Sequence, residues 1–150
     1  MSKKTILVID DDPDVRSGLR IRLQAHGYEI FFAADAVTSV SQARKHKPDL
    51  IVLDLGLPGG DGFVVMERLK AIPDLSAIPV IIVSGRDVHA NHERALKAGA
   101  RAFLQKPAEN AELLKAIRVA LGETVEVKHL PALELEAEST PRSARGDAIR

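Results

Sequence analysis

Short apolar runs alternate with amphipathic segments along most of this chain, and that alternation constrains the fold more than any other feature. The runs are continuous and rich in β-branched residues, which is typical of strands that are covered on both faces of a parallel sheet. They occupy residues 6–9, 30–33, 50–53, 80–83 and 102–104.

Helix signals fill the intervals between these runs. Asp12 can cap a helix whose first turn holds Pro13, and apolar side chains then recur at Val15, Leu19 and Leu23. Five strand–helix units predict an α/β domain with three layers, a doubly wound sheet and right-handed crossovers. The other predicted helices are residues 36–47, a segment beginning near residue 62, residues 87–98 and a segment ending near residue 122.

The chain has 150 residues, which suggests one domain. We predict that this domain occupies residues 1–122 and that residues 123–150 form a polar, flexible extension without an effector domain. The stretch "TVEVKHL" at residues 124–130 alternates weakly, so a short strand there is an alternative.

Composition excludes several classes of function. The chain has 21 basic and 21 acidic residues, so nothing in its net charge favours direct binding of nucleic acid or of an anionic membrane. It has no cysteine, which excludes disulfides, thiol catalysis and cysteine-bound zinc. No apolar run is long enough for a signal peptide or a membrane span, and we expect a cytoplasmic protein.

Polar side chains follow the predicted strands where each strand ends, and in a parallel sheet these ends share one edge. Each has an ordinary explanation taken alone, such as a helix cap, a turn or a solvated strand exit. Together they would place several carboxylates, a hydroxyl and an ammonium group side by side. They are Asp10, Asp11 and Asp12 after the first strand, Asp54 after the third, Ser84 at the end of the fourth and Lys106 after the fifth.

Clustered carboxylates repel one another by several kcal/mol at a protein-like dielectric constant, and a divalent cation removes that repulsion. Oxygen ligands favour Mg²⁺, which commonly meets a phosphate. A carboxylate can attack phosphorus to form an aspartyl phosphate, while a lysine and a hydroxyl neutralise the phosphoryl oxygens. The turn "LPGGDG" after Asp54 lacks the Gly-Lys-Ser/Thr ending of a phosphate-binding P-loop.

Four stretches of the chain resemble the receiver domain of two-component response regulators. They are "ILVIDDDPDVR", "PDLIVLDLGLPGGDGF", "IPVIIVSG" and "GARAFLQKP", and the resemblance covers residues 4–121. It implies a flavodoxin-like fold with strand order 2-1-3-4-5. It also implies a phosphoprotein that accepts a phosphoryl group from a sensor histidine kinase or a histidine phosphotransfer protein, with Mg²⁺ as cofactor.

The resemblance assigns a role to each matching position. Asp54 would be the phosphoacceptor, and Asp10, Asp11, Asp54 and the backbone carbonyl of Gly56 would bind Mg²⁺, with Asp11 favoured over Asp10 as a direct ligand. Asp12 is favoured as the helix cap. The remaining positions are Ser84 and Lys106, which would contact the phosphoryl group, Phe103, which is either an aromatic switch or core packing, and Pro107, which would follow a cis peptide bond.

Arg86 matches a position that tunes the attacking water in this family, so the lifetime of the phosphate stays open. Phosphorylation would remodel the surface formed by the helix at 87–98, the strand at 102–104 and the last helix, which would act on a downstream protein or effector domain. A homodimer through the same face is a further implication, with Ala95, Leu96, Lys97, Arg101, Leu104 and Gln105 on it.

Two other functions are open at this stage. A haloacid-dehalogenase-like phosphatase would use Asp10 and Asp12, but it needs an acidic pair at a later strand end, where only Glu109 and Glu112 occur, and it leaves Asp54 unexplained. A receiver-like interaction module that is never phosphorylated would keep the fold alone. On the leading hypothesis the protein is not an enzyme beyond catalysing its own phosphorylation and dephosphorylation, and it is either a stand-alone receiver or part of a longer regulator.

Overall fold

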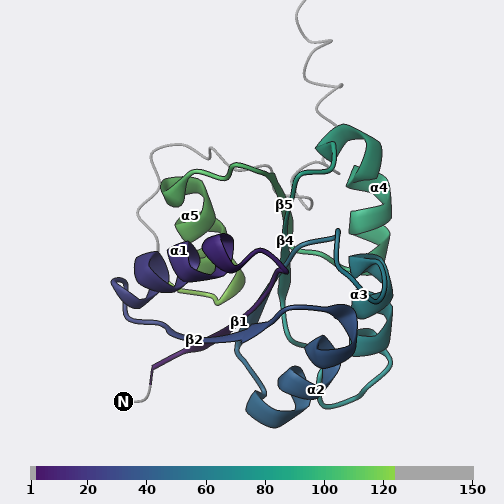
Figure 1. The fold of residues 1–150 in the computed structure, drawn as a ribbon, viewed down its shortest axis with the longest axis horizontal. Coiled ribbons are helices and arrows are strands. Elements are labelled where there is room, and N and C mark those ends of the chain that lie inside the picture. The colour runs from purple at the N-terminus through teal and green to yellow at the C-terminus, as the bar shows by residue number, and fades with distance from the viewer. Residues whose placement is uncertain (1–2, 124–150) are drawn as a thin grey trace, which may run out of the picture.

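The computed structural model describes residues 3–123, which form a five-stranded parallel sheet flanked by five helices (Figure 1). The strands lie in the order β2-β1-β3-β4-β5, which confirms the predicted doubly wound fold. In chain order the elements are β1 (Thr5–Ile9), α1 (Pro13–Gln24), β2 (Glu29–Ala33), α2 (Ala36–His46), β3 (Leu50–Leu53), α3 (Gly62–Lys70), β4 (Val80–Ser84), α4 (Val88–Ala98), β5 (Ala102–Gln105) and α5 (Asn110–Ala120).

The sheet is the middle of three layers. Helices α1 and α5 cover one face, and α2, α3 and α4 cover the other (Figure 1). Successive residues of β1 point to opposite faces, so Ile6 and Val8 pack with α1 and α5 while Leu7 and Ile9 pack with the other three helices. Because both faces are buried, the strands are apolar at successive positions and carry polar residues only at their ends, which explains the continuous runs in the sequence.

Aspartates begin four of the five helices. The side chain of Asp12 accepts a hydrogen bond from the Asp14 N–H at 2.9 Å, and Asp35 accepts one from the Thr38 N–H at 2.7 Å. Asp61 and Asp87 cap α3 and α4 in the same way. Each cap satisfies a backbone donor that has no partner within its helix.

The cap of α2 carries a testable pH dependence. Hydrogen bonds from the backbone and side chain of Thr38 lower the pKa of Asp35 below 3.8. We expect Asp35→Ala to lower the melting temperature at neutral pH by about 3 °C. A carboxyl group whose pKa is lower in the folded than in the unfolded protein stabilises the fold above its unfolded-state pKa. This stabilisation is lost as the pH falls through the folded-state pKa. The difference between variant and wild type should therefore be constant above pH 3.8 and shrink as pH falls further below it in thermal melts, and a difference that does not shrink there would contradict the cap.

Some details differ from the sequence predictions. Helix α2 ends at His46 rather than Lys47, because Lys47 adopts a left-handed conformation with φ of 43°. Ala95 and Leu104 were expected on a dimer face, but they are 0% and 3% exposed and pack in the core, so they are unavailable to a partner.

The predicted extension, with its alternative strand at 124–130, lies outside the described residues apart from Glu123. Within residues 3–123, no helix is long and apolar enough to cross a membrane.

Candidate functional site

The strand register brings the candidate site residues to one edge of the sheet. Ile9 of β1 lies opposite Leu53 of β3, so Asp10 and Asp54, which follow them, emerge together. The Asp54 N–H donates to the Ile9 carbonyl at 2.9 Å, which extends the pairing of the two strands to Asp54 itself. Ser84 is the last residue of β4, and the N–H of Lys106, after β5, donates to its carbonyl at 2.8 Å.

Three carboxylates meet at this edge. One oxygen from each of Asp10, Asp11 and Asp54 can be chosen so that all three atoms lie within 4.8 Å of one another. Asp10 and Asp54 are buried, with 3% and 8% of their surface exposed, whereas Asp11 is exposed. The site therefore has two buried carboxylates and one that faces solvent.

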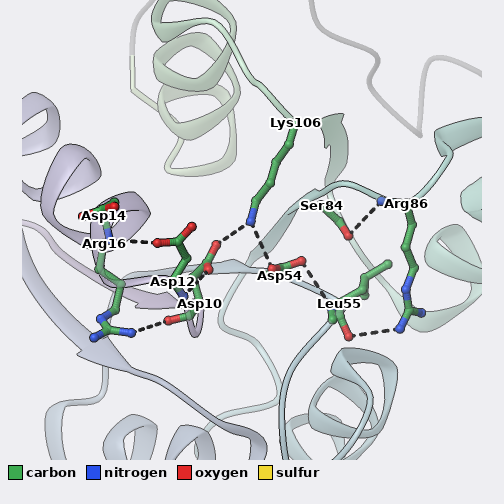
Figure 2. A network of polar contacts seen from close by, with 10 residues as sticks. Asp10, Asp12, Asp14, Arg16, Asp54, Leu55, Ser84, Arg86 and Lys106 are labelled. Atoms are coloured by element: carbon green, nitrogen blue, oxygen red, sulfur yellow. Dashed lines mark hydrogen bonds and ion pairs between the residues drawn. The ribbon is translucent and has the colours of Figure 1, made fainter.

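Lys106 lies between the two buried carboxylates (Figure 2). Its Nζ is 2.8 Å from Asp10 Oδ2 and 3.0 Å from Asp54 Oδ2. Burial acts to lower the pKa of Lys106, but the hydrogen bonds and charges of Asp10 and Asp54 outweigh it and raise this pKa above 10.5. The Lys106–Pro107 peptide bond is cis.

Backbone donors orient the other carboxylate oxygens. The Gly56 N–H donates to Asp54 Oδ1 at 3.2 Å, and the Asp12 N–H donates to Asp10 Oδ1 at 2.9 Å. Arg16 Nη1 donates to the Asp10 carbonyl at 2.8 Å. Both buried carboxylates are thus held in place by the protein's own contacts.

These residues fit a divalent cation. The donors are all carboxylate oxygens, which suit Mg²⁺. With the three carboxylates ionised, their charge exceeds that of the Lys106 ammonium by two negative units, which a divalent cation would balance. Asp10, Asp11 and Asp54 would hold the ion, and the exposed Asp11 leaves an open side for water and a phosphate.

Ser84 and Phe103 are both buried, at 1% exposure each. Ser84 Oγ accepts a hydrogen bond from the Arg86 N–H at 3.3 Å, and Ser84 and Lys106 lie on different sides of Asp54 (Figure 2). Phe103 packs in the core cluster shared with α2, α3 and α4. This agrees with its core-packing interpretation, and its role as a switch stays a prediction.

Sequence reasoning gave no role to Gly62, the first residue of α3. A Cβ at this position would lie 2.6 Å from Leu55 Cα and 2.7 Å from the Asp54 carbonyl oxygen, closer than real Cβ atoms come. Only glycine lets α3 begin so near the end of β3 and Asp54. The sequence signal for this close approach was a glycine directly after Asp61, the residue that caps α3.

A second contact that the sequence did not indicate joins Arg86 to Asp61. Nη1 of Arg86 lies 3.0 Å from Oδ2 of Asp61. The two residues belong to different strand–helix loops, so neither motif nor periodicity links them. The phosphatase alternative gains no support, because Asp12 is the cap of α1 and Glu112 lies within α5.

Comparisons with known proteins agree with this geometry. Residues 6–118 match the family described as "Response regulator receiver domain". The chain is 40% identical over 116 residues to the KDP operon transcriptional regulatory protein KdpE of Escherichia coli, which covers 77% of this chain and 50% of KdpE. It is 36% identical over 117 residues to the protein PilH of Pseudomonas aeruginosa, which covers 78% of this chain and 97% of PilH.

A solved structure is similar over the same part of the chain. It is the receiver domain of the sensor histidine kinase PA1611 from Pseudomonas aeruginosa, with a magnesium ion coordinated in its active site cleft. The TM-score is 0.74 at 26% identity, covering 81% of this chain and all of that one.

The chain spans about half the length of KdpE but nearly all of PilH. On the family match over residues 6–118 and these likenesses, the chain belongs to the response regulator receiver domain family.

Proposed function

We propose that this protein is a phosphorylation-controlled switch whose phosphoacceptor is Asp54. The observation that carries the proposal is the meeting of three carboxylates within 4.8 Å, with Lys106 bonded to two of them. A structural ion pair alone would not need a third, exposed carboxylate beside it. The Mg²⁺-bearing receiver domain of PA1611, similar in fold, supports the same use of the site.

In the proposed reaction, an Asp54 carboxylate oxygen attacks the phosphorus of a phosphohistidine on a sensor histidine kinase or phosphotransfer protein. The new O–P bond forms as the N–P bond breaks, and its electron pair stays on the leaving imidazole nitrogen. Mg²⁺, held by Asp10, Asp11, Asp54 and the Gly56 carbonyl, would supply charge neutralisation at the phosphoryl oxygens.

The protein's own groups complete the site. Lys106 already contacts Asp54 and would donate to a phosphoryl oxygen once that carboxylate is esterified. The Ser84 hydroxyl would turn from the Arg86 N–H toward the phosphoryl group, and Phe103 would follow it. On this proposal the protein catalyses only its own phosphorylation and dephosphorylation. We propose that it acts in the cytoplasm.

The output surface would be the exposed part of α4, β5 and α5. Because Ala95 and Leu104 are buried, the side chains available to a downstream partner or a second copy are Leu96, at 38% exposure, and the exposed Lys97, Arg101 and Gln105. Phosphorylation would remodel this surface, so a local charge change at Asp54 would reach a partner there.

Removal of the metal tests the proposal. With acetyl phosphate and Mg²⁺, intact-mass spectrometry should show one added phosphoryl group, and excess chelator should slow labelling by about a hundredfold because charge neutralisation at phosphorus is lost. Steady hydrolysis of a phosphate ester would instead favour the phosphatase alternative. Failure to bind either Mg²⁺ or beryllofluoride would favour the interaction module.

A further inference from the structure

The side chain of Arg86 crosses from the loop after β4 to the loop after β3, where its Nη2 donates to the Leu55 carbonyl at 3.3 Å (Figure 2). Its Nη1 forms an ion pair of 3.0 Å with Asp61 Oδ2. The Arg86 and Asp61 side chains are only 37% and 33% exposed. A planar guanidinium can make two such contacts at once, whereas a lysine ammonium is a point charge on a flexible stem.

Both contacts reach the ends of one loop, residues 55–61. At the far end, Asp61 uses its other oxygen, Oδ1, to accept the Phe63 N–H that begins α3. At the near end, the Leu55 carbonyl also accepts the Gly62 N–H at 2.8 Å. Arg86 therefore reinforces the closure of this loop beside Asp54.

Gly56 lies inside the closed loop and has little else to hold it. It is exposed, and a Cβ built on it would meet nothing within 4 Å. The peptide group that joins Leu55 to Gly56 is held at both of its polar atoms. Arg86 and Gly62 bind its carbonyl oxygen, and Asp54 Oδ1 accepts its N–H at 3.2 Å. This held peptide group is the fixed base from which the backbone dihedrals of Gly56 aim the next carbonyl, that of Gly56.

We infer that Arg86 is a positioning residue of the metal site, which orients the Gly56 carbonyl by holding the Leu55–Gly56 peptide and Asp61. The inference rests on the proposed function, because it assumes that Mg²⁺ binds at this edge of the sheet. Mutating a residue that holds a metal ligand in position, without binding the metal itself, commonly weakens metal affinity by about 10- to 100-fold.

The experiment compares Mg²⁺ binding by wild type, Arg86→Ala, Arg86→Lys and Asp61→Asn, followed by NMR at the amides of the loop. We expect about tenfold weaker binding in Arg86→Ala, and a smaller loss in Arg86→Lys. Asp61→Asn should also weaken binding, because asparagine keeps the cap of α3 but loses the ion pair. Glu93→Gln removes the exposed pair with Lys97 on α4 and should change nothing.

A second measurement needs no metal. Hydrogen exchange at the Gly62 amide reports closure of the loop, and it should be faster in Arg86→Ala and Asp61→Asn than in wild type. If Arg86→Ala fails to fold, Arg86→Lys and Asp61→Asn decide the question. Wild type that binds no Mg²⁺ would overturn the proposed function itself. Wild-type binding with equal affinity and equal Gly62 exchange in the variants would overturn only the role of Arg86.

Discussion

Asparagine in place of Asp54 should abolish phosphoryl transfer, with a loss of at least about a thousandfold in labelling rate. The amide is nearly the same size as the carboxylate, and its oxygen can still accept the Gly56 N–H. It is not a nucleophile toward phosphorus, and it brings no negative charge to the cation. The measurement is intact-mass spectrometry after incubation with acetyl phosphate and Mg²⁺.

Asp74→Asn is the matched control for this variant. Asp74 is an exposed aspartate far from the site whose only described ion pair, with Lys47, is 3.8 Å long, so labelling should equal that of wild type. Peptide mapping of the labelled wild type should place the phosphoryl group on Asp54. Undiminished labelling of Asp54→Asn, or a phosphoryl group mapped to Asp10, would refute the assignment.

Methionine in place of Lys106 should destabilise the metal-free protein. The variant leaves Asp10 and Asp54 buried side by side without the cation that now bonds to both. Breaking a buried ion pair costs about 3–5 kcal/mol, and because 26% of the Lys106 side chain is exposed we expect a smaller loss, about 2 kcal/mol in the free energy of unfolding. Urea denaturation with chelator present measures it.

The pH dependence of this loss has a definite sign. The folded-state pKa of Lys106 is raised above 10.5, so its stabilising effect is complete below 10.5 and disappears as pH rises through the folded value. Wild type and variant should therefore converge in alkaline buffer. Lys70→Met, which loses only an exposed hydrogen bond to the Ser76 carbonyl, should cost less than about 0.5 kcal/mol. Equal stability of wild type and Lys106→Met at neutral pH would contradict the proposed charge balance.

Much of the fold is readable in the sequence because it depends on local patterns. Apolar runs such as residues 80–83 are β-branched and continuous because both faces of the sheet are covered. Asp12 before Pro13 marks the start of α1 by its capping chemistry. The order of the parallel strands then requires Asp10 and Asp54 to share an edge, so their proximity was predictable from position alone.

Contacts between side chains distant in sequence required the tertiary structure. Which carboxylate oxygens Lys106 approaches depends on how the chain leaves β5, and the pairing of Arg86 with Asp61 depends on how two loops pack. The burial of Ala95 depends on how α4 packs on one face of the sheet, and the burial of Leu104 depends on the packing of the opposite face, which α1 and α5 cover. Periodicity and capping act within a few residues, whereas these contacts depend on the relative placement of whole elements. The sequence therefore specified which groups gather at the strand ends, and three-dimensional packing decided which of them touch.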